Sequence, residues 1–393
     1  MDRTRWSRLP LAMLTALASL LGATVAAAQD GDGDGIPDAI EDEGWYVQAG
    51  GNRDRQDVWV ECDSMRKTVK KRGQLRQRAE AVFDRAPVSG GITLHLVFDD
   101  VIPFEAQWGD VGTPEGFVET FERTVEEYER SFDVRPFTGA NAQTMRPYVH
   151  YCVFVESIGG NGTSGYSFGI PGDLFVVALG QYRGQLPPWF LRAGETGTFL
   201  HELGHNLGLT HGGGKPQPHL AYKPNFLSVM NYHFQFAFVR LVESRAEFFD
   251  YWDYSRARSG PVHEKRLRER DGIALPEAVT IAETSRGDQL LGLTFCDGYE
   301  LRAFRWNAPV DFDCDGVVAP GKIRFDATGD GRLTTLGRGQ TDWENLVFGT
   351  VGLGAGRVPL LPDPETELNR PGVERLVRGA LTLARRPLAP EVP

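Results

Sequence analysis

The spacing of apolar residues predicts a mixed order of strands and helices over the first half of the chain. Runs in which alternate residues are apolar are typical of strands, and stretches with apolar residues three or four apart are typical of helices. The predicted strands are 57–62, 92–98, 148–155, 164–169 and 174–179, and the predicted helices are 72–86, 114–132 and a segment that contains His201 and His205. We interpret the helix at 114–132, which Thr113 and Pro114 open, as an insertion.

Residues 201–211 read HELGHNLGLTH and carry the strongest chemical signal of the chain. Residues four apart share a face of a helix, so His201 and His205 can present two nitrogens to one metal ion, with Glu202 beside them. Gly208 can adopt backbone angles that other residues avoid, so the helix can end there and the chain can bring His211 to the same ion. Three histidines and an open fourth position are typical of a catalytic zinc site.

Chance does not account for this pattern. An HExxH pentapeptide alone occurs on ordinary amphipathic helices, where each histidine is usually structural. With the added glycine and third histidine, the five fixed positions are expected about 5 times in 100,000 chains of this composition. The segment therefore predicts zinc as a cofactor.

The pattern in residues 201–211 resembles HExxHxxGxxH, the signature of the metzincin clan of zinc endopeptidases. That clan has a tight turn with a methionine beneath the metal, and SVMNY at 228–232 resembles this Met-turn, with Met230 19 residues beyond the third histidine. Tyr232 resembles the astacin and serralysin subgroups, in which a tyrosine at this place can ligate zinc. The alternative is a structural tyrosine whose hydroxyl is bonded elsewhere. Gly212 matches no familiar subfamily marker, so the subfamily is unassigned.

The predicted strand order is similar to the upper subdomain of metzincins over residues 44–240. The resemblance implies an α+β catalytic domain with a mixed five-stranded sheet, an active-site helix and a Met-turn. In that architecture the first and third strands are neighbours, and the fourth, here 163–169, is the edge over the cleft. We expect the free backbone groups of this edge to bind an extended peptide as an added strand. The alternative is an ordinary surface loop rich in glycine and serine.

Residues 1–28 have the pattern of an export signal. Three arginines precede an apolar stretch at 9–21, and Ala26-Ala27-Ala28 fits a cleavage site. The alternative is a membrane anchor, but the apolar run is short and interrupted. Removal of three arginines and one aspartate with this leader takes the formal net charge from −11 to −13. We expect a secreted, monomeric protein without a stable membrane anchor, with the periplasm as a location in transit. Its acidity argues against nucleic acid or anionic membranes as partners.

Four cysteines in an exported chain indicate two disulfides. Proximity in the sequence favours Cys296 with Cys314, and Cys62 would then pair with Cys152. The metzincin strand order also implies that Cys62 and Cys152 lie close together. The alternative for these two is a pair of free, buried thiols.

The residues that follow the leader have the spacing of a calcium loop. Acidic side chains stand at positions 1, 3, 5, 9 and 12, glycine stands at position 6, and position 7 offers a backbone carbonyl. The residues in question are Asp30, Asp32, Asp34, Gly35, Ile36, Asp38 and Glu41. The continuation Gly-Ile-Pro-Asp resembles thrombospondin type 3 loops more than an EF-hand. A disordered acidic leader is the alternative.

A second acidic region repeats the first half of this pattern twice, with aspartates at Asp311, Asp313 and Asp315 and then at Asp326 and Asp330. Position 12 is Lys322 in the first repeat and Gly337 in the second, so both lack the bidentate acid. We expect weak calcium binding or ligands borrowed from Asp342 or Glu344. The alternative is an acidic surface rich in turns. Calcium would act as a structural cofactor outside the cell.

These signals divide the chain into a signal peptide at 1–28, a calcium-binding loop at 29–43, a metzincin-like catalytic domain at 44–280, an acidic region with a disulfide at 281–350 and a C-terminal tail at 351–393. The resemblance implies a secreted zinc endopeptidase that hydrolyses proteins or peptides. Glu202 would be the general base, and Tyr232 would contact zinc at rest and donate to the oxyanion. The alternatives are a secreted zinc hydrolase of a non-peptide substrate and a calcium-dependent adhesion or binding module with non-catalytic zinc.

Overall fold

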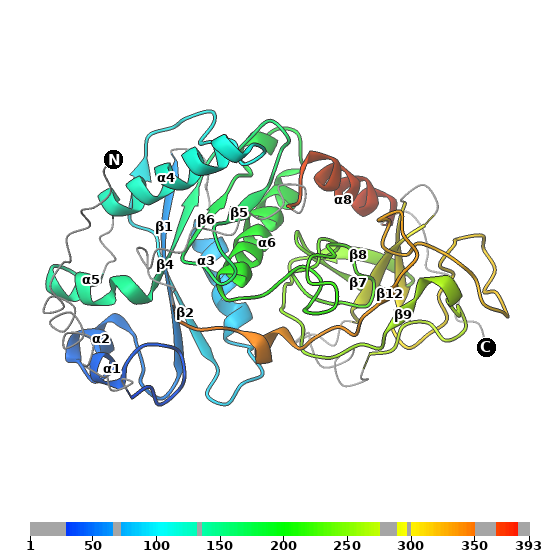
Figure 1. Ribbon diagram of the computed structural model, residues 1–393, viewed down its shortest axis with the longest axis horizontal. Helices are drawn as coiled ribbons and strands as arrows, with labels where there is room; N and C mark the ends of the chain where they lie inside the picture. Colours follow the sequence, from blue (N-terminus) through cyan, green and yellow to red (C-terminus); the bar gives the residue numbers. More distant parts are fainter. Residues whose placement is uncertain are drawn as a thin grey trace, which may run out of the picture.

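The computed structural model describes residues 29–65, 72–131, 136–275, 289–296, 300–349 and 367–383. The predicted export signal and much of the predicted tail lie outside these ranges. The described residues form two lobes that meet near helix α6 (Pro188–Asn206), as Figure 1 shows. The first lobe contains the main sheet, and the second contains three two-stranded sheets.

The main sheet is mixed, as predicted. Its strands follow the order β2 (Ile92–Val97), β1 (Gln56–Met65), β4 (Val149–Phe154), β6 (Leu174–Val177) and β5 (Gly165–Ser167). Neighbouring strands run parallel, except that β5 is antiparallel to β6. The first and third predicted strands are therefore neighbours, and the fourth is the edge. A sixth strand that was not predicted, β3 (Val101–Ile102), pairs with the end of β1.

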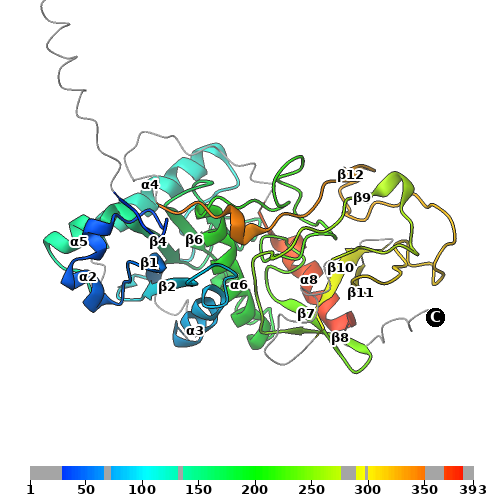
Figure 2. The ribbon, with the colours of Figure 1, turned by 90° about the horizontal axis from the view of Figure 1, so that it is seen from below.

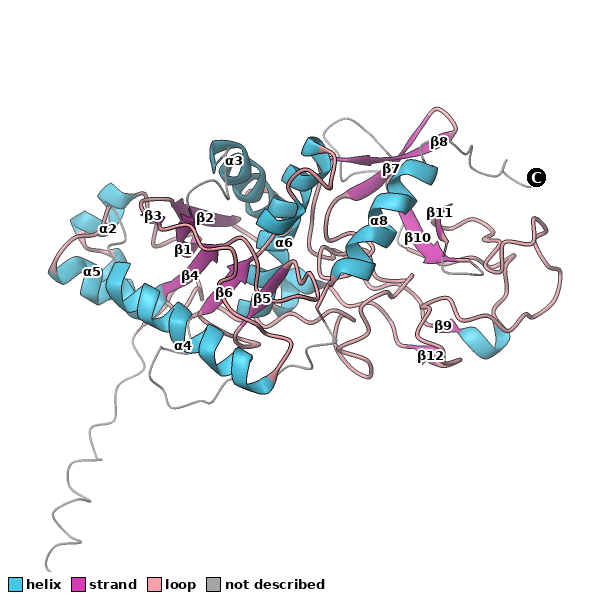
Figure 3. Cartoon of the chain, turned by 90° about the horizontal axis from the view of Figure 1, so that it is seen from above, coloured by secondary structure: helices cyan, strands magenta, loops and turns pink. Residues whose placement is uncertain are grey.

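Helices cover both faces of this sheet (Figure 3). Successive side chains of a strand point to opposite faces, and in β4 Tyr151 and Val153 pack with residues of α4 (Pro114–Ser131). Cys152 and Phe154 belong to the core on the other face, with α3 (Arg72–Phe83) and α6. The predicted helices at 72–86 and 114–132 are thus present, and the segment interpreted as an insertion forms one layer of the domain. Shorter helices are α1 (Asp38–Glu41), α2 (Gly44–Ala49) and α5 (Ala140–Met145), with 3₁₀ turns η2 (Arg146–Tyr148) and η3 (Gly180–Tyr182).

The second lobe is built from short antiparallel pairs and one helix. The pairs are β7 (Phe238–Val242) with β8 (Arg245–Phe249), β10 (Leu291–Phe295) with β11 (Leu301–Arg305), and β9 (Val262–His263) with β12 (Thr335–Leu336). The 3₁₀ turn η4 (Glu264–Arg266) follows β9. Helix α8 (Arg370–Leu383), in the predicted tail, packs on β8 and β11, and Val373, Leu376 and Leu383 belong to the main core. No helix or strand was predicted from the sequence in this tail.

A segment at 339–349, drawn in orange, returns from the second lobe to the first (Figures 1 and 2). It contains the 3₁₀ turn η6 (Asp342–Asn345). The N–H of Val347 donates to the carbonyl of Leu207 at 2.9 Å, at the end of α6. Further along, Gly349 approaches Gly35 so closely that a Cβ at Gly35 would lie 2.7 Å from the Cα of Gly349. The segment therefore connects the end of the motif helix to the N-terminal acidic loop.

One of the two predicted disulfides is present. Cys296 and Cys314 are bonded, with their Cα atoms 5.6 Å apart. The predicted bond between Cys62 and Cys152 is absent, and both are free, buried thiols. The two residues are direct partners on the parallel strands β1 and β4. The expected proximity is therefore real, but side chains that stand side by side on paired strands do not have the converging geometry that a disulfide requires.

Over the described ranges, every helix is too short or too polar to cross a membrane.

Candidate metal centre

Two glycines let α6 lie in direct contact with the loop that follows the motif. A Cβ at Gly197 would lie 1.6 Å from the carbonyl oxygen of Gln235, and a Cβ at Gly204 would lie 2.4 Å from the Sδ of Met230. Any larger residue at either place would push the loop away. The helix is buried from residue 196 to its end, so its polar motif side chains lie inside the protein.

The helix ends where the motif predicts. Gly208 has φ +84°, a left-handed conformation that glycine adopts without strain. The N–H of Leu209 donates to the carbonyl of Gly204 at 2.8 Å, which closes the helix end. The chain then turns back and places His211 beside the two helical histidines.

The Nε2 atoms of the three histidines converge on one point. They lie 3.2 Å (His201 to His205), 2.9 Å (His205 to His211) and 3.1 Å (His201 to His211) apart. Tetrahedral ligands about 2.0–2.1 Å from one zinc ion lie about 3.3 Å from one another. The triangle of nitrogens therefore fits one zinc ion.

Hydrogen bonds fix which nitrogens face the centre of this triangle. The Nδ1 of His201 donates to the carbonyl of Val229 at 2.9 Å, and the Nδ1 of His205 donates to the carbonyl of Leu209 at 2.8 Å. Because a carbonyl only accepts, each Nδ1 carries the proton and each Nε2 points a lone pair inward. Burial lowers the pKa of His205 to about 4 and holds the pKa values of His201 and His211 well below their usual range. Neutral imidazoles whose Nε2 atoms converge in this way suit a shared cation.

Glu202 is an orphaned carboxylate in the same site. It is fully buried, and neither of its oxygens has a hydrogen-bond partner. Burial, and then the charge of Glu367, raise its pKa well above the ordinary range. A carboxylate in such a place costs free energy unless a cation or a bound water partners it. The donor set and this orphaned group together fit a zinc ion with a hydrolytic water.

Gly165 at the edge strand makes room for this carboxylate, a role that the motif did not reveal. A Cβ at Gly165 would lie 2.6 Å from the Oε1 of Glu202 and 2.6 Å from the Cγ2 of Thr198. Gly165→Ala is expected to displace Glu202 and to lower kcat/KM of any reaction in which Glu202 acts by about 100-fold, the cost of a misplacement of about 1 Å. Gly160→Ala, where a Cβ would meet nothing within 4 Å, is the control. Steady-state kinetics of both variants check this, and equal rates for both would show that Gly165 does not position Glu202.

The turn at 228–231 lies directly under the histidines. The N–H of Asn231 donates to the carbonyl of Ser228 at 3.0 Å, and Met230 is fully buried against Gly204. The ring centroid of Tyr232 lies 4.8 Å from that of His211, and its hydroxyl donates to the Oε2 of Glu367 at 3.4 Å. Tyr232 therefore stands at the site, with its hydroxyl on a carboxylate.

That carboxylate, Glu367, is the group that the sequence analysis missed. It precedes α8, is 6 % exposed, and its Oε1 lies 4.0 Å from the Nε2 atoms of His205 and His211. Its carboxylate and the three imidazoles form one cluster of possible metal ligands, all within 4.8 Å of one another. Glu367 stands far from the motif in the sequence, in a stretch without periodicity, so no local signal marks it.

Comparison with known proteins adds little to this geometry. No protein-family model matches the chain, and no curated protein sequence matches it significantly. Among solved structures, a zinc-dependent peptidase from Methanocorpusculum labreanum is similar at 12 % identity and TM-score 0.29, over 44 % of this chain and 86 % of that one. Metalloproteinase-II from Bacteroides fragilis is similar at 15 % identity and TM-score 0.27, over 44 % of this chain and 45 % of that one. Archaemetzincin from Methanopyrus kandleri is similar at 16 % identity and TM-score 0.25, over 44 % of this chain and 81 % of that one. Likeness at this level carries no argument, so the conclusions below rest on the residues of the site.

The N-terminal acidic loop brings most of its predicted ligands together. Asp30, Asp32 and Asp34 form one cluster of possible ligand atoms, and Asp34 and Glu41 form a second with Asp57 of β1. Glu41 is 1 % exposed, and neither of its carboxylate oxygens has a hydrogen-bond partner. Glu41, at position 12 of the loop, therefore points into this second cluster, as the spacing predicts. Asp57 was not predicted, because it stands at the start of a strand outside the loop.

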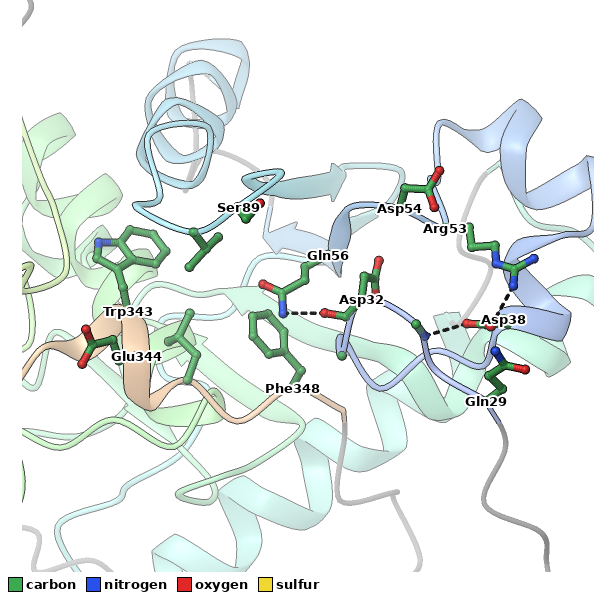
Figure 4. Close-up of a pocket in the computed structure, with 14 residues that line it drawn as sticks. Gln29, Asp32, Asp38, Arg53, Asp54, Gln56, Ser89, Trp343, Glu344 and Phe348 are labelled. Atoms are coloured by element: carbon green, nitrogen blue, oxygen red, sulfur yellow. Dashed lines mark hydrogen bonds and ion pairs between the residues drawn. The ribbon is translucent and has the colours of Figure 1, made fainter.

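Asp38, the predicted ligand at position 9, lies elsewhere. It accepts a hydrogen bond from the N–H of Gly31 and pairs with Arg53 at 2.9 Å. Beside it lies a pocket of about 660 Å³, lined by the acidic loop on one side and by Trp343, Glu344 and Phe348 on the other (Figure 4). Ile36, at position 7 of the loop, is buried, and its N–H donates to Asp34 at 2.7 Å. Asp38 thus stabilises the loop from outside the cluster.

Two glutamates that the sequence did not suggest bind the backbone of the second acidic region. Glu269 accepts hydrogen bonds from the N–H groups of Phe312 and Ala319 and clusters with Asp311 and Asp313. Glu264 in the same way accepts from the N–H of Ala327. Both glutamates are fully buried and lie within six residues of each other, after β9.

The remaining aspartates of these two loops accept hydrogen bonds from backbone N–H groups of the same loop. Asp315 accepts from the N–H of Val317, Asp326 accepts from the N–H of Gly331, and Asp330 accepts from the N–H of Arg332. Such hydrogen bonds are typical of turns whether or not a cation is bound.

The expected donors Asp342 and Glu344 do not serve this region, so that expectation is wrong. Asp342 accepts hydrogen bonds from the hydroxyl of Ser228 and from the N–H of Ser255, under the metal centre. Glu344 accepts a hydrogen bond from the hydroxyl of Thr341. The segment that carries both residues has left the acidic region and runs back to the first lobe, and sequence distance alone does not reveal such a path.

Proposed function

We propose that this protein is a zinc-dependent endopeptidase. The observation that carries the proposal is the convergence of three Nε2 lone pairs next to Glu202, a buried carboxylate without a partner. His201, His205 and His211 would hold the ion. Zinc bound there would supply a Lewis acid that lowers the pKa of water toward neutrality and polarises a carbonyl group.

The residues of the chain would perform the remaining steps. Glu202 accepts the proton of the attacking water and later returns it to the amine of the leaving fragment. Tyr232 donates a hydrogen bond to the oxyanion as it develops. Burial holds the pKa of Tyr232 well above its usual range, so its hydroxyl keeps the proton that this role needs.

A peptide is the substrate that the surroundings favour. The edge strand β5 carries Gly165 directly against Glu202. An extended peptide added to this edge would run past the catalytic carboxylate and expose its backbone to it. A hydrolase of a non-peptide substrate would not need a strand edge at this place.

The rival function is a binding module with structural zinc, and Glu367 is the observation that favours it. A structural site has four protein ligands and no general base. Glu367 lies near enough to be a fourth ligand, yet such a site leaves Glu202 without a role. Zinc content by mass spectrometry, combined with turnover on peptides and on small esters, separates the three functions. One zinc with peptide cleavage supports the proposal, one zinc with ester cleavage alone supports the second function, and one zinc with no turnover, by the parent protein or by its Glu367→Ala variant, supports the third.

We also propose that the N-terminal loop binds calcium. Asp30, Asp32 and Asp34 crowd together, and the buried, unpartnered carboxylate of Glu41 clusters with Asp34 and Asp57. Carboxylates this close repel one another unless a cation joins them, and hard oxygen ligands suit calcium. The loop lies against the segment that returns from the second lobe, so calcium there would hold the two lobes together.

Calcium should therefore control the pH dependence of stability. Without the ion, burial raises the pKa of Asp34 to about 7 and that of Glu41 to about 8. The unfolded state releases these protons near pH 4, whereas the folded state holds them until the pH approaches 7 to 8. The free energy of unfolding therefore falls as the pH rises from about 4 to about 8. Calcium at 100 times its Kd should add about 2.7 kcal/mol. Thermal unfolding from pH 5 to 8, in calcium and in a calcium-selective chelator, checks this.

Glu41→Gln, which removes the charge at position 12, should weaken the calcium effect, and Glu43→Gln on the exposed neighbouring residue is the control. Identical melting curves with calcium and with the chelator at pH 8 would contradict the calcium site.

Export remains a proposal that rests on residues 1–28. It accords with the predicted role of calcium, which is plentiful outside cells, and with the disulfide between Cys296 and Cys314, because disulfides persist in oxidising compartments.

A further inference from the structure

We propose that the C-terminal segment 367–383 occupies the catalytic cleft and holds the enzyme in a latent state, with Glu367 as the fourth ligand of the metal. Latency rests on the proposed function, because only an enzyme can be latent. The role of Glu367 as a metal ligand can be measured without any substrate.

The position of the carboxylate suits a metal ligand. Ligands about 2.0–2.2 Å from one zinc ion lie about 3.3 Å apart when tetrahedral and at most about 4.3 Å apart. The Oε1 of Glu367 lies 4.0 Å from the Nε2 atoms of both His205 and His211. Both distances are too long for a hydrogen bond but within the span of two atoms that share an ion.

The surroundings of Glu367 also suit a ligand of a cation. The side chain is 6 % exposed, and its partners among the described residues are the hydroxyl of Tyr232 and the imidazoles of His205 and His211. Glu202, a second carboxylate, lies close enough to act on it electrostatically. Two buried acids beside neutral imidazoles must either keep their protons or share a positive charge. A zinc ion inside the histidine triangle supplies that charge.

The backbone of the segment lies on the substrate edge. The N–H of Ser164, directly before β5, donates to the carbonyl of Leu368 at 3.0 Å, and the N–H of Arg370 donates to the carbonyl of Asn161 at 2.9 Å. The segment is therefore hydrogen-bonded to the chain that leads into β5, as an extended substrate would be. Glu367 then stands where a substrate carbonyl would meet the metal.

Helix α8 anchors the segment. Leu368 and Leu376 are buried in the main core, and the guanidinium of Arg375 lies 5.6 Å and 5.0 Å from the ring centroids of Tyr222 and Phe295. Figures 1 and 3 both show α8 beside α6, between the two lobes. Tethering gives the Glu367 carboxylate a high effective concentration at the metal, so it outcompetes water and free peptide until the segment is displaced.

Zinc affinity and catalysis of the full-length protein test the proposal together. Glu367→Ala and the isosteric Glu367→Gln remove the ligand, and Glu374→Gln on the exposed face of α8 is the matched control. We expect both Glu367 variants to bind zinc at least tenfold more weakly in competition with a chromophoric chelator. In the cobalt-substituted protein, their visible absorption should shift as one carboxylate ligand is replaced. At saturating zinc, their kcat/KM for peptides should rise at least tenfold, while Glu374→Gln should match the parent in all three measurements.

The outcomes are distinguishable. Unchanged zinc affinity and an unchanged cobalt spectrum in Glu367→Gln, with native circular dichroism, would overturn the proposal even if peptides are cleaved. Changed affinity and spectrum without peptide cleavage by any variant would keep Glu367 as a ligand and refute the proposed peptidase. Weaker zinc binding with peptide cleavage at the parental rate would overturn latency, because the segment would then not block the cleft.

Discussion

Glu202→Gln is expected to lower kcat/KM for peptide hydrolysis by about 10²–10⁴-fold, the contribution typical of a general base. The amide keeps the size of the buried side chain but cannot accept the proton of the attacking water. Glu202 is not among the converging nitrogen atoms that would bind the ion, so zinc content should stay at the parental value. Steady-state kinetics and metal analysis of the purified variant measure both quantities.

The variant also has a structural signature. Because the parental carboxylate is buried without a hydrogen-bond partner, its neutral amide should leave the thermal stability of the zinc-free protein equal or higher. Glu195→Gln on the same helix, outside the motif, is the control and should cleave peptides like the parent. If Glu202→Gln cleaves peptides at the parental rate, Glu202 is not the base.

His205→Ala is expected to abolish both zinc binding and turnover. His205 is one of the three converging histidines, and its Nε2 lies 2.9 Å from the Nε2 of His211 and 3.2 Å from the Nε2 of His201. Loss of a residue that orients a ligand typically costs 10–100-fold in metal affinity, so loss of the ligand itself should cost more than about 100-fold. Chelator competition measures the affinity, and peptide turnover at saturating zinc measures the activity.

His263→Ala is the matched control, since His263 is a half-exposed histidine on β9 whose Nδ1 forms a hydrogen bond with the hydroxyl of Thr335. It should retain zinc and activity. One bound zinc and parental turnover in His205→Ala would show that the ion binds elsewhere.

Local patterns predicted most of the first lobe. The apolar periodicity of 57–62, 92–98 and 148–155 predicted β1, β2 and β4, because successive side chains of a strand point to opposite faces of a sheet. The spacing of His201, His205 and Gly208 predicted the convergence of the histidines, because helix geometry and one left-handed residue determine it.

Features that depend on long-range packing could not be predicted. Glu367 reaches the histidines only because α8 packs on the second lobe, and no sequence period records that contact. Glu264 and Glu269 precede the acidic loops whose N–H groups they bind, whereas the calcium-loop pattern places its last acid at the end of each loop. The predicted strand order correctly placed Cys62 and Cys152 close together, but strand order does not give the direction of a side chain.

Digestion of a proteome-derived peptide library, read by mass spectrometry, tests the central claim most directly. The zinc-loaded Glu367→Ala protein should be used, so that the C-terminal segment cannot mask activity, with Glu202→Gln/Glu367→Ala as its partner. We expect new internal cleavages with the first protein and a loss of about 10²–10⁴-fold in their rate with the second. Peptides left intact by a folded protein that holds one zinc ion, or cleaved equally by both, would contradict it.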